Sequence, residues 1–286
     1  MVSSVTALIT DSTCDVPNDL VSKYGIVVVP AYIVWGDEVL RDGIDIQPEA
    51  FYERLERDRE YPTTAHPTPE DFVEVYRAQR EAGAQELVVI TVSSAMSGTF
   101  EVAQQAAGEM DIPVHVVDSK GPSMSLGWQV LAAVRAREAG GDAQRMVAAA
   151  ASVRERLVHY VSLDTLEYLH KGGRIGGATR FVGTLLRIKP LVSINHEKGE
   201  VEASGRARTR SRAVNGLYTT FFEALDTSRP LHVAVFHGKA REEAEELAAR
   251  IRRDYAPKEL LMDVTGPVLG VHTGPGALAL SGYTET

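Results

Sequence analysis

The stretch from Glu86 to Glu109 constrains the fold of this chain more than any other. It opens with the apolar, largely β-branched run ELVVITV, continues with the hydroxyl-rich run SSAMSGTF, and ends with small apolar residues and helix formers. An apolar run without polar alternation is typical of a strand covered on both faces of its sheet. The sequence therefore predicts a buried strand at 86–92, followed by a helix that begins at Gly98.

Hydroxyl groups gather where this strand gives way to the helix, on Ser93, Ser94, Ser97 and Thr99. The first turn of a helix has unpaired backbone N–H groups and the positive end of the helix dipole, so an anion can bind there. The alternative interpretation is that the hydroxyls only cap the helix.

Strands and helices alternate over the first half of the chain. We expect strands at 5–10, 26–35, 38–40, 86–92 and 113–117, and helices at 17–25, 48–59, 68–83, from 98, 125–138 and 143–157. This order is typical of a parallel, doubly wound sheet, in which ligands bind beyond the carboxyl ends of the strands. Asp11, Ser93 and Asp118 follow such strands, which favours a polar site over capping alone.

The pattern changes after Leu157. We expect strands at 158–163, 191–195, 200–208, 231–236, 259–264 and 268–271, and helices near 166–172 and at 181–188, 209–222 and 240–255. Lys198-Gly199 forms the turn before the strand that reaches Arg208. The prediction is two α/β domains: an N-terminal one at 1–157 with the parallel sheet, and a C-terminal one at 158–286 with a mixed sheet.

Composition excludes several classes of protein. The formal net charge of −9 argues against general nucleic-acid binding. The single cysteine, Cys14, excludes an internal disulfide and fits a reducing compartment. The first ten residues read as a strand and not as a signal peptide, and no apolar run is long enough to span a bilayer. We expect a cytoplasmic protein.

Several catalytic and cofactor motifs are absent. No G-x-G-x-x-G follows the first strand, and GGRIGG lacks the ending of a phosphate-binding P-loop. There is no G-x-S-x-G elbow, which disfavours a serine hydrolase of that type. The histidines show no metal-ligand spacing, so we expect no metal.

Two further features have both a plain and a functional interpretation. His272 ends an expected strand before Thr273 and the run GPG, so it forms an ordinary turn or is held to hydrogen-bond an oxygen ligand. The chain is locally basic from Lys171 to Arg212, which is either a solvated face or a patch for a phosphate or an acidic partner. Arg174, between glycines, is the member of this run most suited to a fixed role.

Together these motifs resemble the DegV family, the bacterial fatty-acid-binding proteins that serve a fatty acid kinase. The resemblance covers nearly the whole chain. It rests on motifs that follow in family order: ITDST at 9–13, TTAHPTPEDF at 63–72, SSAMSGTF at 93–100, DS at 118–119, LEYLHKGGRI at 166–175, KP at 189–190, RTR at 208–210 and GVHTGPGALA at 270–279.

The resemblance implies two α/β domains and one long-chain fatty acid, with its acyl chain in an apolar tunnel. Thr64, one of Ser93 or Ser94, and His272 would hydrogen-bond the carboxylate. The residues implied at this ligand site are Thr63, Thr64, Ser93, Ser94, Gly98, His272 and Thr273. Arg174 and Arg208 match family arginines linked to the head group and to phosphorylation by the kinase.

The implied function is that of a carrier without catalytic residues. It would present the carboxylate to an ATP-dependent fatty acid kinase with a dihydroxyacetone-kinase-like domain, and the acyl phosphate would enter phospholipid synthesis. No cofactor, metal or nucleic acid is expected, and at most a transient membrane contact. The alternatives are an enzyme that processes a small carboxylate or ester with Ser94 and His272, and a lipid-responsive regulator.

The chain departs from the family pattern in two places. Thr64-Ala65-His66-Pro67 stands where Thr-Ser-Gln-Pro is usual, and Met96 stands where leucine is common. His66 either adds a donor at the head group or faces solvent.

Overall fold

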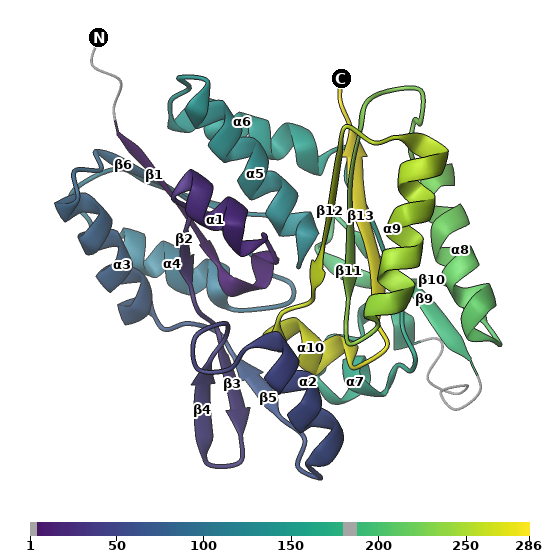
Figure 1. The fold of residues 1–286 in the computed structure, drawn as a ribbon. Helices are drawn as coiled ribbons and strands as arrows, with labels where there is room; N and C mark the ends of the chain where they lie inside the picture. The colour runs from purple at the N-terminus through teal and green to yellow at the C-terminus, as the bar shows by residue number, and fades with distance from the viewer. Residues whose placement is uncertain (1–4, 180–187) are drawn as a thin grey trace. The chain divides into compact units, whose positions relative to one another are not determined.

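The computed structural model describes residues 5–179 and 188–286 (Figure 1). The chain forms two compact units, which we call unit 1 (residues 1–32, 65–155 and 196–199) and unit 2 (residues 33–64, 156–195 and 200–286). This division differs from the predicted boundary after Leu157, because 33–64 belong to unit 2 and the turn at 196–199 to unit 1. The two domains at 1–157 and 158–286 stay a prediction.

Unit 1 is built on the parallel sheet that the sequence predicted. This sheet has four strands in the order β2-β1-β6-β7. Its strands are β1 (Thr6–Asp11), β2 (Val27–Val29), β6 (Glu86–Thr91) and β7 (Val114–Asp118). Its helices are the short 3-10 helix η1 (Ser12–Cys14), α1 (Asn18–Tyr24), α3 (Pro69–Glu81), α4 (Thr99–Ala107), α5 (Met124–Glu138) and α6 (Ala143–Arg154).

Both faces of this sheet are covered. Leu87 and Val89 of β6 pack in a cluster with residues of α3 and α4. Val88 and Ile90, which point to the opposite face, are also fully buried, and α5 and α6 contact β6 (Figure 1). The unbroken apolar run of β6 is therefore explained by burial on both faces.

Unit 2 contains a mixed six-stranded sheet in the order β10-β9-β8-β13-β11-β12. Its strands are β8 (Val158–Ser162), β9 (Lys189–Asn195), β10 (Glu200–Ala207), β11 (Leu231–His237), β12 (Glu259–Val264) and β13 (Leu278–Thr284). The pair β11 and β12 is parallel, whereas β13 pairs antiparallel with both β8 and β11. A large apolar core joins this sheet to α8 (Arg210–Glu223) and α9 (Arg241–Tyr255).

The remaining elements of unit 2 include β5 and α10, which carry Thr63, Thr64, His272 and Thr273. These remaining elements are a three-stranded sheet in the order β4-β3-β5 and three helices. Their bounds are β3 (Tyr32–Trp35), β4 (Glu38–Arg41), β5 (Thr63–Ala65), α2 (Pro48–Arg57), α7 (Glu167–Lys171) and α10 (Pro267–Thr273).

The prediction of a strand at 268–271 is wrong, because these residues lie in helix α10. Pro267 occupies its first turn, and Gly274, at φ +70°, follows its last residue. A short apolar run does not distinguish a strand from a buried helix by its periodicity, whereas proline at the first position favours the helix. The expected strand at 26–35 is two strands, separated at Pro30. The expected helix at 181–188 lies almost entirely outside the described residues.

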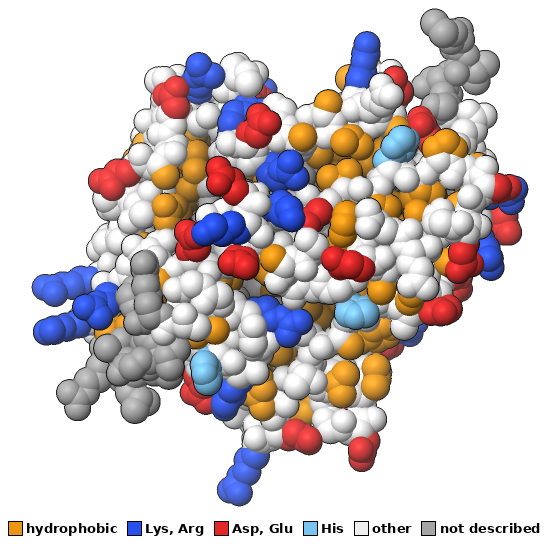
Figure 2. All heavy atoms as spheres, turned by 180° about the vertical axis from the view of Figure 1, so that it is seen from behind, with side chains coloured by type: hydrophobic (Ala, Val, Ile, Leu, Met, Phe, Trp, Pro, Cys, Tyr) orange, Lys and Arg blue, Asp and Glu red, His pale blue; other side chains and the backbone are white. Residues whose placement is uncertain are grey.

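Charged side chains of both signs are interspersed over the face shown in Figure 2. Within 5–179 and 188–286, none of the helices has the length and apolar content needed to cross a membrane. The same residues contain no group of three or more His, Cys, Asp or Glu side chains placed to hold a metal ion.

Candidate functional site

In unit 2, Thr64 and His272 form a hydrogen-bonded pair. Thr64 lies in β5 and His272 in the last turn of α10, and 3.1 Å separates Thr64 Oγ1 from His272 Nε2. The family resemblance implied both residues at one site, and the structure brings them together across 208 positions of the chain. His272 ends a helix and not the strand that the sequence predicted.

The imidazole of His272 is neutral at physiological pH. Burial, assisted by the charge of Arg174, lowers its pKa to about 4. Its Nδ1 is buried and has no hydrogen-bond partner among the described residues. Gly172 lies directly against this atom, since a Cβ added at 172 would be 2.1 Å from Nδ1.

The surroundings of His272 assign its single proton to Nε2. A buried N–H without an acceptor is rarer in proteins than a buried lone pair, so Nδ1 is the nitrogen without a proton. His272 Nε2–H then donates to Thr64 Oγ1, and the Thr64 hydroxyl proton is left to donate to another group. The pair thus presents a polarised hydroxyl, which suits a carboxylate oxygen.

The other predicted residues of unit 2 have different surroundings. Thr63 is exposed, and as the neighbour of Thr64 in β5 it points to the opposite face of that strand. Thr273 Oγ1 donates to Leu269 O at 3.0 Å, so its proton is used within α10. Arg174 is exposed and donates to Gly172 O at 2.8 Å.

Arg208 is exposed just after β10. No hydrogen bond or ion pair joins its guanidinium to any residue that the structure describes. An arginine in this position is accessible to a partner.

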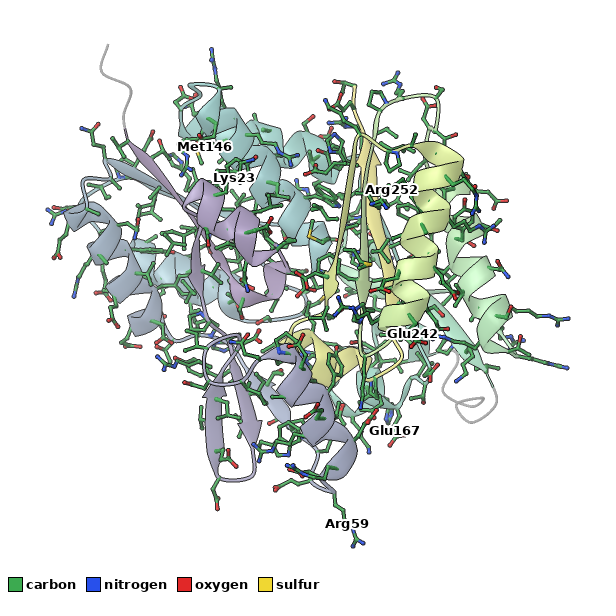
Figure 3. The ribbon with its side chains drawn as sticks, viewed as in Figure 1. Lys23, Arg59, Met146, Glu167, Glu242 and Arg252 are labelled. Atoms are coloured by element: carbon green, nitrogen blue, oxygen red, sulfur yellow. The ribbon has the colours of Figure 1, made fainter. Side chains whose placement is uncertain are left out.

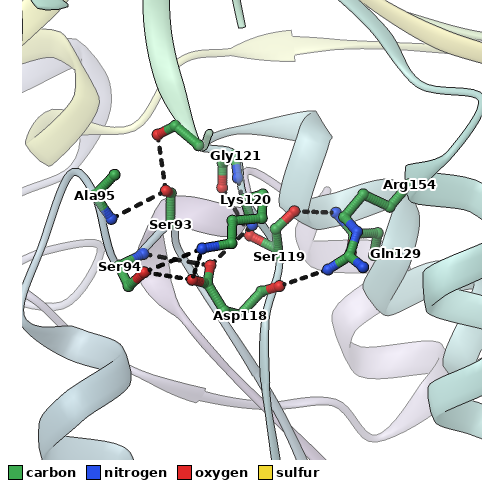
Figure 4. A network of polar contacts seen from close by, with 10 residues as sticks. Ser93, Ser94, Ala95, Asp118, Ser119, Lys120, Gly121, Gln129 and Arg154 are labelled. Carbon is green, nitrogen blue, oxygen red and sulfur yellow. Dashed lines mark hydrogen bonds and ion pairs between the residues drawn. The ribbon is translucent and has the colours of Figure 1, made fainter. Parts of the chain in front are cut away.

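In unit 1, Ser93 and Ser94 lie beyond the carboxyl end of β6, but each has an acceptor for its proton (Figure 4). Ser93 is fully buried and donates to Gly199 O at 2.8 Å. Ser94 donates to the carboxylate of Asp118. A ligand carboxylate would have to compete with these acceptors, so the role predicted for either serine stays a prediction.

Among the described residues, the capping interpretation fits Ser97 but not Ser93 or Ser94. The residue that precedes α4 is Gly98, which has no side chain to cap the helix. Ser97 Oγ accepts from Thr99 N, the first N–H of α4, at 3.4 Å and lies 2.8 Å from Thr99 Oγ1. A Cβ at Gly98 would be 3.0 Å from the His66 ring, which explains why glycine suits this position.

Asp118 is a charged carboxylate. Burial acts to raise its pKa, but hydrogen bonds from Lys120 and Ser94 outweigh that effect and hold the pKa below its usual value. Lys120 Nζ lies 2.8 Å from Asp118 Oδ2. Lys120 was not singled out from the sequence, because one lysine after Asp118-Ser119 carries no pattern.

The surroundings of His66 assign the proton of its neutral ring to Nδ1. Its Nδ1 lies 2.8 Å from Pro67 O and donates to that carbonyl, so Nε2 has no proton. The imidazole that replaces the usual glutamine therefore accepts hydrogen bonds on its free nitrogen. The side chain is exposed.

Asp11 supports the loop that follows β6. It is fully buried, and it accepts from Val92 N at 2.7 Å, Thr13 N at 3.0 Å and Thr13 Oγ1 at 2.5 Å. Burial raises the pKa of Asp11, while these hydrogen bonds act to lower it. Asp11 therefore joins the ends of β1 and β6 and positions the backbone just before Ser93.

A turn from the second half of the chain completes this part of unit 1. His196 Nε2 lies 2.9 Å from Ser125 Oγ, and Gly199 O accepts from Ser93. A Cβ at Gly199 would be 2.1 Å from Ser93 Oγ, so only glycine fits there. The sequence predicted the turn at Lys198-Gly199, but no signal in it indicated that this turn contacts Ser93 and Ser125.

Comparison with known proteins agrees with the fold and the motifs. A family model described as "Uncharacterised protein, DegV family" matches residues 5–285. A DegV domain-containing protein of Streptomyces coelicolor is 38% identical over 276 residues, which cover 96% of each chain.

Two solved structures share the fold over nearly their whole length. One is a DegV family protein from Thermus thermophilus described with fatty acid binding (TM-score 0.92, 33% identity, 98% of this chain and 100% of that one). The other is DegV from Bacillus subtilis, described as a fatty acid binding protein (TM-score 0.91, 27% identity, 99% and 100%). The chain belongs to the DegV family.

Proposed function

We propose that this protein is a carrier that binds one long-chain fatty acid. The observation that carries the proposal is the Thr64–His272 pair, in which a neutral, buried imidazole leaves the threonine hydroxyl free to donate. Two relatives of the same fold, from Thermus thermophilus and Bacillus subtilis, are described as binding fatty acids.

The energetics of such a ligand fit this arrangement. A carboxylate withdrawn from water is costly unless donors meet it, and the Thr64 hydroxyl is one such donor. Each buried CH₂ contributes about 0.8 kcal/mol, so a long acyl chain of about 16 carbons gains on the order of 10 kcal/mol before entropy losses. The affinity for the ligand thus comes mainly from burial of its acyl chain, and the Thr64–His272 pair fixes the orientation of its head group.

Replacement of Thr64 by valine tests the pair. Thr64→Val keeps the shape of the side chain and removes the hydroxyl, so we expect the affinity for palmitate to fall about tenfold, or about 1.4 kcal/mol. Thr63→Val is the matched control, because Thr63 is the exposed neighbour on the opposite face of β5, and it should bind palmitate normally. Equal affinities for the two variants in a fluorescence-displacement titration would contradict the proposal.

We further propose that the bound carboxylate is presented to an ATP-dependent fatty acid kinase, and that the acyl phosphate serves phospholipid synthesis. Arg208 supports this step because it is exposed and has no partner among the described residues. A guanidinium in this position suits a developing phosphate or an acidic surface of the kinase.

Arg208→Ala separates the kinase step from fatty acid binding. We expect acyl phosphate formation with the cognate kinase to fall about tenfold, while the affinity for palmitate is unchanged. Arg206→Ala, also exposed and two residues away on β10, is the matched control. Equal kinase rates for both variants and the wild type would remove Arg208 from this role.

The proposed carrier has more support than an ester-processing enzyme. A nucleophilic serine needs a base, but the hydroxyl of Ser94 donates to Asp118, whose pKa is lowered. Such a carboxylate is a weak base at neutral pH. No observation favours the lipid-responsive regulator.

A further inference from the structure

Unit 2 contains a cavity of about 670 Å³ that none of the fatty-acid site residues lines. It lies where β11 and β12 end, beside the first turn of α9 and one face of α2. The two strands are parallel neighbours connected through α9. Open α/β sheets bind ligands at this place, beyond the carboxyl ends of parallel strands, and the volume is within the usual range for small-molecule sites.

His237, the last residue of β11, supplies a donor to this cavity. Its side chain lines the cavity, and the residue is only 8% exposed. Its Nδ1 accepts from Ala240 N at 3.4 Å, so the proton of the neutral ring is on Nε2. That Nε2–H has no hydrogen-bond partner among the residues described. A donor of this kind is satisfied by a ligand oxygen.

The charges around His237 leave the ring neutral. Burial lowers its pKa, and the positive charge of Arg241 acts in the same direction. The carboxylates of Asp263, Glu245 and Glu49 oppose this shift without reversing it. The ring therefore offers one N–H and no net charge to a ligand at neutral pH.

The start of α9 adds further donors beside His237. This helix has 15 residues, and Ala240 at its N-cap provides no side-chain acceptor. Within the described residues, no side chain caps the first backbone N–H groups of this helix. Together with the imidazole N–H they suit a carboxylate.

The remaining side chains of the cavity suit ammonium groups. Its two cations are already paired, Lys239 with Glu56 and Arg241 with Glu245. Four lining carboxylates have no cationic partner among the described residues, and Figure 3 labels one of them at the start of α9. They are Glu49, Glu53, Glu242 and Asp263.

The backbone of the cavity is held in place. Thr265 N donates to His237 O at 2.9 Å, and Gly238 N donates to Ala277 O at 2.9 Å. A Cβ at Gly238 would be 2.9 Å from the Tyr52 hydroxyl oxygen, so glycine is required where the loop passes this ring. A site organised before binding loses less entropy when a ligand enters.

We propose that this cavity binds a free α-amino acid with a basic side chain. The α-carboxylate meets His237 Nε2–H and the first N–H groups of α9, and the ammonium groups meet the unpaired carboxylates. A simple anion is repelled by those carboxylates, and a simple cation leaves the donors without an acceptor. A zwitterion with an additional ammonium group satisfies both sets.

Isothermal titration of the full-length protein with l-lysine and two analogues tests the proposal. The first analogue, 1,5-diaminopentane, lacks the carboxylate, and the second, 6-aminohexanoate, lacks the α-ammonium group. We expect l-lysine to bind at least about tenfold more tightly than either analogue. Binding of either analogue as tight as that of l-lysine, or no binding of l-lysine at millimolar concentration, overturns the proposal.

A pair of charge variants locates the binding. Glu53 is exposed on α2 and lines the cavity, so Glu53→Gln should weaken l-lysine binding by about fivefold or more without unfolding the protein. Glu246→Gln removes the same charge from α9 at an exposed position outside the cavity and should leave binding unchanged. Equal losses in both variants would assign the binding to net charge and contradict the site.

Discussion

Gly172→Ala is expected to lower the affinity for palmitate by at least about tenfold while the protein stays folded. Gly172 has φ −76° and ψ −5°, a backbone conformation that alanine adopts without strain. The Cα hydrogen that alanine replaces with a methyl group, however, points at His272, and the new Cβ would be 2.1 Å from His272 Nδ1. The ring has to turn away, which breaks the hydrogen bond between His272 Nε2 and Thr64 Oγ1.

Gly177→Ala provides the matched control for this variant. A Cβ at 177 meets nothing nearer than Val201 O at 3.5 Å, which is an ordinary contact. Both variants should have thermal unfolding midpoints close to that of the wild type, and only Gly172→Ala should lose affinity. If Gly172→Ala binds palmitate as well as Gly177→Ala does, the imidazole does not hold the head group.

The parallel sheet of unit 1 could be predicted because the pattern and the residue types of its central strand agree. The run from Glu86 to Val92 is short, apolar at nearly every position and rich in β-branched residues, which favours a strand buried on both faces over a buried helix. The start of the helix predicted at 68–83 also has a local signal, because Thr68 and Asp71 form a capping box at the start of α3. Such signals depend on neighbouring residues alone.

Strand β13 could not be predicted, although it lies between β8 and β11 in the sheet of unit 2. Its sequence, LALSGYT, contains serine and glycine, which weaken the pattern of a buried strand. Gly282 is nevertheless required, because a Cβ there would be 2.4 Å from His232 O. The formation of strand β13 therefore depends on its pairing with β8 and β11 and not on its own residue types.

The partners of the site residues are the least predictable part. Ser93 was predicted at a site, but its acceptor, Gly199 O, is 106 positions away and belongs to an ordinary turn. From the residues alone, His272 was equally consistent with a plain turn, and only the family resemblance placed it with Thr64. Gly172 gave no signal, because its role depends on the ring that packs against it.

Asp11→Ala is expected to destabilise the protein most among the variants considered, by about 3–5 kcal/mol in the free energy of unfolding. Asp11 is fully buried and accepts three hydrogen bonds, one from Val92 N and two from Thr13. Alanine would leave these donors without an acceptor at the ends of β1 and β6. Urea unfolding followed by circular dichroism measures the loss as a lower midpoint at an unchanged slope.

Two further variants distinguish lost hydrogen bonds from a general effect of removing an aspartate. Asp11→Asn keeps one acceptor oxygen, so it should lose about 1–3 kcal/mol, less than alanine. Asp37→Ala removes an exposed carboxylate from the turn between β3 and β4 and should change stability by no more than about 0.5 kcal/mol. Since Val92 directly precedes Ser93, the loss in Asp11→Ala should also release the backbone that holds Ser93 against Gly199. A midpoint for Asp11→Ala within error of that for Asp37→Ala would show that this buried carboxylate does not hold the two strands together.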